Sequence, residues 1–115
     1  MPAINFKQQF TSALSSGEKR QTIRKPRKRQ TVPGDTLYLY TGMRTKKVHK
    51  LLETVCLAVL PISIWKSSVR LDGVYLKANE IKDLAELDGF ATTEAFYEFF
   101  RENHGLPFEG EVIKW

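Results

Sequence analysis

The stretch from Leu51 to Trp65 limits the fold more than any other part of the sequence. Its residues are mostly apolar and several are β-branched, which is typical of a buried strand. We expect one long strand here, bent or interrupted at Pro61, because proline removes a donor from the hydrogen-bond ladder of a sheet. A hairpin should follow, since Asp72-Gly73 stands between two short apolar runs and is a residue pair that tight turns prefer.

Three further segments have the character of strands. Residues 3–6 predict a short opening strand, and residues 111–115 predict a closing one. The turn residues Pro33-Gly34-Asp35 precede Thr36 to Tyr40, in which Leu37 and Leu39 would share the buried face. Several short strands are therefore spread along the whole chain.

Three helices are predicted from apolar residues spaced three or four positions apart. The first should end at Gly17, the second should begin at the capping residue Asn79 and end near Asp88-Gly89, and the third should begin at the capping residue Thr92. Their apolar stripes are Phe6, Phe10 and Leu14 in the first, Ile81, Leu84 and Ala85 in the second, and Phe96, Phe99 and Phe100 in the third. Strands and helices in this order predict one α+β domain over residues 1–115, with enough strands for a small barrel.

Charge is divided unevenly along the chain. Residues 1–50 hold 12 Lys or Arg residues against two acidic ones, whereas residues 51–115 hold 6 against 11. One basic surface that could face phosphates is expected from this division. Cys56 lies in an apolar run and is expected to be buried, and one cysteine with two separated histidines excludes a structural zinc site. We expect no metal and no cofactor.

No part of the sequence has the pattern of a secretory signal, and no apolar run is long enough to span a bilayer. We therefore expect a cytoplasmic protein that does not bind membranes.

The stretch from Ser16 to Arg24 is the strongest candidate for a functional segment. Gly17 permits a turn, and a strand from Arg20 onward would place Arg20, Thr22 and Arg24 on one wet face. Ile23 would then anchor the opposite face in the core. A hydroxyl group surrounded by cations suits an anionic or carbonyl-bearing ligand, although a strand edge that carries charge only to avoid pairing with other sheets has the same composition. The candidate binding cations are Arg20, Arg24, Lys25, Arg27, Lys28 and Arg29 here, and Arg44, Lys46 and Lys47 in a second basic loop.

Several of these motifs together resemble the ASCH domain family. They are Ile4-Asn5-Phe6 with the helix that follows, Gly17-x-Lys19-x-x-Thr22-x-Arg24, and Pro33-Gly34-Asp35 before a strand. Asp88-Gly89-Phe90 and the terminal Gly110-Glu111-Val112-Ile113-Lys114-Trp115 complete the resemblance, which covers almost the whole chain in order. The resemblance implies a small PUA-like β-barrel with flanking helices.

The resemblance also implies an activity on RNA or on a modified nucleoside. Some ASCH proteins hydrolyse the amide of N4-acetylated cytidine with a lysine, a threonine and a carboxylate. These roles fall on Lys19, Thr22 and Asp88, although the best-matching hydrolases carry glutamate where this chain has Asp88. In such a site threonine would supply the attacking hydroxyl, neutral lysine would accept its proton, and Arg24 would polarise the carbonyl or hold a phosphate.

Two alternatives use the same residues differently. In a ribonuclease, Lys19, Arg24 and Arg29 would stabilise the charge of a cleaving phosphodiester, with His49 and His104 left as surface or structural residues. In a non-catalytic RNA-binding module, the two basic loops would hold phosphates while an aromatic side chain such as Trp65 stacked on a base. A shared cleft for the three candidate catalytic residues would favour hydrolysis, and an open cationic groove would favour polymer binding.

Overall fold

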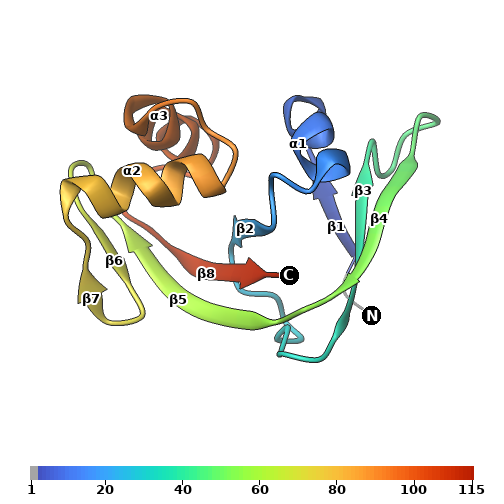
Figure 1. Ribbon diagram of the computed structural model, residues 1–115, viewed down its shortest axis with the longest axis horizontal. Helices are drawn as coiled ribbons and strands as arrows, with labels where there is room; N and C mark the ends of the chain where they lie inside the picture. The colour runs from blue at the N-terminus through green and yellow to red at the C-terminus, as the bar shows by residue number, and fades with distance from the viewer. Residues whose placement is uncertain (1–2) are drawn as a thin grey trace.

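The computed structural model describes residues 3–115, whose strands form two sheets and whose helices lie on one side of them (Figure 1). One sheet has three strands in the order β1-β3-β4, and the other has five in the order β2-β8-β5-β6-β7. The α+β class predicted from the sequence is confirmed. The elements are β1 (Ala3–Phe6), the 3-10 helix η1 (Gln8–Phe10), α1 (Thr11–Ser16), β2 (Gln21–Arg24), β3 (Thr36–Thr41), β4 (His49–Val55), β5 (Ala58–Ile64), β6 (Val69–Leu71), β7 (Val74–Tyr75), α2 (Ala78–Leu87), α3 (Thr93–Asn103) and β8 (Phe108–Lys114).

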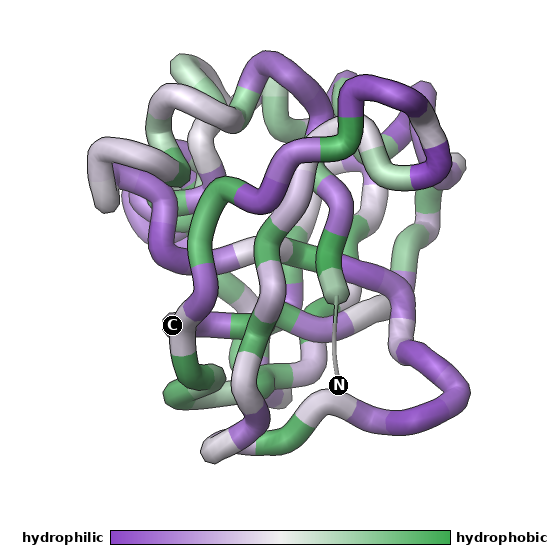
Figure 2. Tube along the Cα trace, turned by 90° about the vertical axis from the view of Figure 1, so that its right-hand side faces the viewer, coloured by the Kyte–Doolittle hydropathy of each residue, from purple (hydrophilic) through white to green (hydrophobic). Residues whose placement is uncertain are grey.

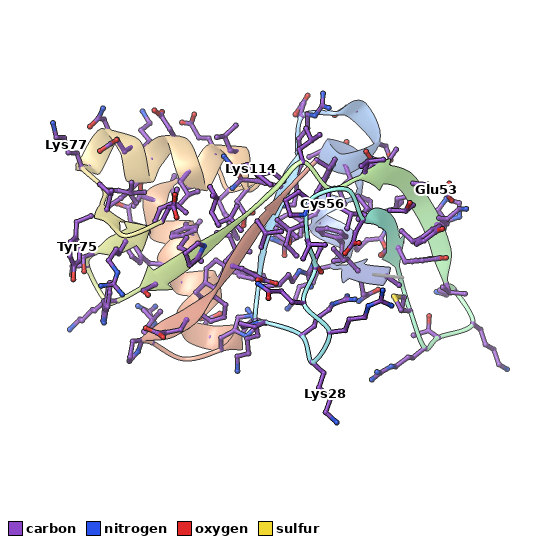
Figure 3. The ribbon with its side chains drawn as sticks, turned by 90° about the horizontal axis from the view of Figure 1, so that it is seen from below. Lys28, Glu53, Cys56, Tyr75, Lys77 and Lys114 are labelled. Atoms are coloured by element: carbon purple, nitrogen blue, oxygen red, sulfur yellow. The ribbon has the colours of Figure 1, made fainter. Side chains whose placement is uncertain are left out.

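The two sheets are joined where β4 bends into β5, at Cys56 and Leu57. The backbone N–H of Cys56 donates to Asp35, which continues the pairing with β3, whereas the N–H of Leu57 donates to Lys114 on β8. Consecutive residues therefore pair with different sheets. Cys56 is 1% exposed and lies near the middle of the molecule (Figure 3), so the prediction that it is a buried residue is confirmed.

The expected break at Pro61 was wrong, because Pro61 lies inside β5 and the interruption comes at Cys56 and Leu57. Proline is tolerated there for a geometric reason. The Pro61 carbonyl accepts a hydrogen bond from the backbone N–H of Asp72, so the edge of Pro61 that lacks an N–H faces β6. Asp72 already belongs to the turn after β6, and the β6 strand therefore loses no hydrogen bond to the proline. The ladder with β8, in which Pro61 lies opposite Glu111, needs no donor from it.

On the other side, the edge strands β1 and β2 are connected through arginine side chains. Arg24 donates to the carbonyl of Asn5 at 2.7 Å, and Arg27 donates to the carbonyl of Ala3. These carbonyls lie two residues apart on β1, which pairs with β3. Within the described residues, no backbone pairing joins β1 to β2, and the strands do not form a closed barrel.

Several predicted boundaries shift because tertiary pairing overrides local pattern. Phe6 stays in β1 opposite Thr41, so the first helix starts later than its apolar stripe suggested. The second helix is capped at Lys77 rather than Asn79, with the Lys77 N–H donating to Glu80. The last strand begins at Phe108 rather than Glu111, and β4 includes the end of the second basic loop. The hairpin at Asp72-Gly73, the Gly17 helix end and the Thr92 cap are confirmed.

The core lies between the five-stranded sheet and the helices α2 and α3, and continues beneath α1. Phe96, Phe100 and Phe108 are at most 2% exposed, and the Phe96 and Phe100 ring centroids lie 5.1 Å apart. Burying aromatic rings of this size contributes much of the driving force for folding. None of the helices formed by residues 3–115 is long and apolar enough to cross a membrane.

We predict that Phe96→Ala lowers the free energy of unfolding by about 3–5 kcal/mol, because it empties a fully buried site among the rings of Phe90, Tyr97 and Phe100. Urea denaturation followed by circular dichroism measures this. The control is Glu98→Ala, an exposed position on the same helix, which should leave stability nearly unchanged. Equal effects of the two substitutions would contradict the assignment of the core.

Candidate functional site

The free edge of β2 faces a cavity of about 230 Å³ between β1, η1 and α3. The side chains predicted to be catalytic, those of Lys19, Thr22 and Asp88, all line it, and so does Arg24. Lys19, Thr22 and Arg24 come from one short segment, and Asp88 lies 69 residues after Lys19 in the chain. The shared cleft that would favour hydrolysis over polymer binding is present.

Lys19 enters the cavity from the turn that follows α1. Gly17 ends this helix with φ +82°, a left-handed conformation that favours glycine, and the backbone N–H of Lys19 then donates to Ala13 at 3.0 Å. The side chain is 2% exposed and passes across aromatic rings, with Nζ 4.8 Å from the centre of the Phe10 ring. A cation held over an aromatic face is stabilised by the ring quadrupole.

The Lys19 ammonium forms an ion pair with Asp88 at the carboxyl end of α2. Lys19 Nζ lies 3.1 Å from Asp88 Oδ1 and 2.5 Å from the Asp88 carbonyl oxygen. The carbonyl groups at a helix C-terminus carry partial negative charge, so the helix end and the carboxylate both attract the lysine. The pair is almost completely buried, with the side chains 2% and 6% exposed.

Gly89 allows the end of α2 to lie close to Phe10 of η1 and to the Lys19 side chain. Its φ is +95°, and a Cβ there would lie 3.1 Å from the Phe10 ring and 3.4 Å from Lys19 Cδ. A side chain at this position would therefore press directly on the lysine. Glycine is required here by both its backbone conformation and its surroundings.

Thr22 and Arg24 lie on the same side of β2, as strand alternation predicts. Thr22 is only 3% exposed, so the expectation of a wet face was wrong: residues of β1, η1 and α3 surround this strand edge. Arg24 Nε donates to Thr22 Oγ1 at 2.9 Å, and its guanidinium lies 4.7 Å from the centre of the Phe6 ring. Ile23 is 5% exposed and belongs to the core, as expected.

Burial moves the charges of the site toward neutrality. Desolvation lowers the pKa of Lys19 and Arg24 lowers it further, whereas Asp88 opposes this shift. Desolvation also raises the pKa of the Asp88 carboxyl, against the opposing effects of Lys19 and Arg24. The Arg24 pKa falls to about 10, again mainly through burial, so this guanidinium remains charged at neutral pH.

Further polar residues line the cavity that sequence reasoning had not assigned to the site. Lys7 donates to Asn103 Oδ1 at 2.7 Å, a bond that links the end of β1 to the end of α3. His104 stacks on Phe100 with ring centroids 5.8 Å apart, and burial together with nearby cations lowers its pKa. Asn5 also lines the cavity. The sequence signal for His104 was its place directly after the aromatic helix.

The other predicted binding cations lie outside this cavity. Arg20 donates to the carbonyl of Trp115 at 3.2 Å, and Arg27 to that of Ala3. Exposed positions are taken by Lys25, Lys28 and Arg29 in the loop after β2, and by Arg44, Lys46 and Lys47 in the loop before β4. The loop after β2 forms a continuous hydrophilic stretch on the outside of the fold (Figure 2).

A scan against protein-family models, a search of curated proteins and a search of solved structures each found no match.

We predict that Asp88→Asn lowers the free energy of unfolding by about 3–5 kcal/mol, because it leaves the buried Lys19 without its charged partner. The double variant Lys19→Met/Asp88→Asn should regain most of this loss, since neither charge then remains buried. Chemical denaturation of the wild type, the single variants Lys19→Met and Asp88→Asn, and the double variant measures the coupling.

The matched control is the exposed pair Lys50–Glu53, whose side chains are 50% and 52% exposed. Glu53→Gln should change stability little, because solvent screens such a pair. Strict additivity of the Lys19 and Asp88 substitutions would show that the two groups are not coupled.

Proposed function

We propose that this chain is an ASCH-type protein that hydrolyses the amide bond of an N4-acylated cytidine, either as a nucleoside or within RNA. The observation that carries the proposal is the buried cavity in which Lys19, Thr22 and Asp88 converge, with Arg24 bonded to the threonine hydroxyl. An amine, a hydroxyl and a carboxyl around one small hollow are the groups that amide hydrolysis needs.

A PUA-like barrel is the fold that we propose for this family member. The bend at Cys56 and Leu57 supports it, because there one strand passes from pairing with β3 to pairing with β8. On the opposite side, the arginine bonds to β1 hold the two sheet edges together where backbone pairing is absent from the described residues. The cavity lies at this interrupted edge.

In the proposed reaction, the Lys19–Asp88 pair first redistributes a proton. Burial favours the neutral form of both groups, so the ammonium proton passes to the carboxylate along the 3.1 Å contact. The amine of Lys19 is then able to accept a proton, and Asp88 is able to donate one. The net charge of the pair does not change in this step.

Thr22 then attacks the acyl carbonyl. Its Oγ1 forms the new bond to carbon as its proton moves to Lys19, and the carbonyl π bond breaks so that the negative charge develops on the carbonyl oxygen. Arg24 Nε, 2.9 Å from Oγ1, orients the hydroxyl for this attack. Collapse of the tetrahedral intermediate breaks the C–N bond, and Asp88 protonates the departing N4 amino group. Water then hydrolyses the threonine ester by the same steps, and the acyl group leaves as the free acid.

Arg24 retains donors for the substrate carbonyl. A guanidinium has five N–H groups, and Arg24 uses one to donate to the Thr22 hydroxyl and another to donate to the carbonyl of Asn5. The other N–H groups remain available to a ligand. A third N–H directed at the carbonyl oxygen would stabilise the tetrahedral oxyanion.

The cavity size favours a small ligand over a folded polymer. Its volume of about 230 Å³ lies below the range of about 300–1,000 Å³ typical of pockets for drug-sized ligands. A base with a short acyl group would fill it, leaving the ribose at the mouth, and an RNA substrate would have to present the base flipped out of its stack.

The ribonuclease alternative is less well supported. Phosphodiester cleavage commonly uses separate acid and base groups on either side of the phosphate. Of the two histidines, His104 lines the cavity while His49 lies at a different hollow beside Lys47. The cations of the two basic loops do not line the cavity that holds Lys19.

We predict that the purified protein releases cytidine from N4-acetylcytidine and that Thr22→Val lowers kcat by at least about a hundredfold, because it removes the attacking oxygen while preserving shape. Lys19→Ala should abolish the release, and Thr22→Ser should restore part of it. Chromatographic quantification of cytidine measures these rates.

The matched control compares two arginines near β2. Arg24→Gln should lower kcat by about 10²–10³ by removing oxyanion stabilisation. Arg20→Gln should retain activity, because Arg20 lies outside the cavity. Cleavage of structured RNA, or RNA retention without cytidine release, would instead support the ribonuclease or the binding module.

We also predict a bell-shaped pH dependence of kcat/KM, because the active Lys19–Asp88 pair holds one proton: the neutral amine accepts the threonine proton and the protonated carboxyl donates to the leaving amine. The value of kcat/KM should rise as the doubly protonated pair loses its first proton and fall as the pair loses its second. A pH–rate profile for N4-acetylcytidine checks this, and a profile without a falling limb would contradict the assignment of Asp88 as the acid.

A further inference from the structure

A second cavity, of about 490 Å³, lies between the basic loop after β2 and the strands β5 and β8. Its volume falls within the range of about 300–1,000 Å³ that is common for ligand pockets. It shares no lining residue with the cavity that holds Lys19. The lining residues that matter here are Pro26, Arg27, Lys28, Val59, Pro61 and Glu111.

Glu111 is the unusual residue of this second cavity. It is only 6% exposed, and its Oε1 atom is buried without a hydrogen-bond partner among the described residues. Burial raises the pKa of its carboxyl, an effect that Arg27 partly offsets. Buried polar atoms in folded proteins are nearly always paired, so an unpaired carboxylate oxygen at a cavity wall calls for a donor from outside the chain.

The neighbouring side chains leave Glu111 Oε1 without a hydrogen bond. Arg24, the β2 residue opposite Glu111, donates to Thr22 and to the carbonyl of Asn5, and Arg27 donates to the carbonyl of Ala3. Lys28 and Gln30, which also line the cavity, make no bond to this oxygen among the described residues. On the other side of Glu111, Pro61 carries no polar side-chain atom.

The rest of the lining indicates what shape and charge the donor should have. Pro26, Val59 and Pro61 provide apolar surface suited to the face of a flat ring. Lys28 extends from the loop into solvent, away from the sheets (Figure 3), where its ammonium can meet an anionic group. A planar ring that carries N–H donors at one end and a phosphate at the other combines these features.

We propose that this second cavity binds a nucleotide whose base carries an exocyclic amino group. Glu111 accepts a hydrogen bond from the amino group, as carboxylates accept from the N4 amino group of cytosine. The apolar residues contact the ring, and Lys28 contacts the phosphate. Uracil is rejected, because it presents a carbonyl oxygen where cytosine presents the amino group, and that oxygen repels the carboxylate.

This site is independent of the proposed hydrolysis, and the test separates the two. CMP and UMP are titrated into the full chain by isothermal calorimetry, since these nucleotides have the same ribose and phosphate and differ in the base only at position 4 and at the hydrogen on N3. We predict that CMP binds at least about tenfold more tightly than UMP, and that Glu111→Gln removes this preference.

Glu111→Gln also provides a check on folding. A neutral amide is less costly to bury than an unpaired carboxylate, so the variant without nucleotide should melt at the same or a higher temperature than the wild type. Glu109→Gln is the matched control on the same strand: Glu109 is exposed, and this variant should keep the preference for CMP.

Three results would overturn the proposal. They are the absence of saturable CMP binding, equal affinity for CMP and UMP, and unchanged CMP binding in Glu111→Gln. Thr22→Val locates the nucleotide. CMP affinity that is unchanged in Thr22→Val and falls to that of UMP in Glu111→Gln supports the second cavity, whereas the reverse pattern assigns the nucleotide to the cavity that holds Lys19 and overturns the proposal.

Discussion

The buried ion pair between Lys19 and Asp88 is the interaction on which the cavity depends. It connects the turn after α1 to the end of α2, two segments that are 69 residues apart in the chain. Two charges withdrawn from water are costly unless they are paired and hydrogen-bonded, so each holds the other in place. The same burial drives the lysine pKa down and the aspartate pKa up, which makes the pair a store for one exchangeable proton. Desolvation of Lys19 and Asp88 is thus both the free-energy cost of burying the pair and the cause of the pKa shifts on which the proposed proton transfer depends.

The architecture explains why this pair shares a cavity with the Thr22 hydroxyl. β2 is an edge strand, and its free edge is not paired with β1; arginine side chains connect the two strands instead. The gap between the sheets leaves room for the cavity, and Arg24 serves both purposes, bonding to β1 and to the Thr22 hydroxyl. The structure that holds the two sheets together is therefore also the structure that positions the candidate nucleophile.

Local chemistry predicted much of this arrangement, and long-range pairing accounts for what it missed. Strand alternation correctly placed Thr22 and Arg24 on one face, and the turn residues located Gly17 and Asp72-Gly73. Alternation does not reveal what covers an edge strand, so Thr22 was expected in solvent although it is buried. The bend after β4 was misplaced for a similar reason: proline was the only local signal, whereas the true bend is set by a change of pairing partner. The cavity role of His104 depends on packing between α3 and β1, which no local pattern encodes.

We propose that Thr22 receives the acyl group during the reaction, and detection of that acyl group on Thr22 by mass spectrometry is the most direct test. The full chain is mixed with N4-acetylcytidine, quenched in acid within a single turnover, and digested. We predict one acetyl group on the peptide that contains Thr22, and no such adduct in the Thr22→Val variant. Formation of cytidine with the acetyl group on Lys19, or with no acetylated residue at any time point, would contradict it.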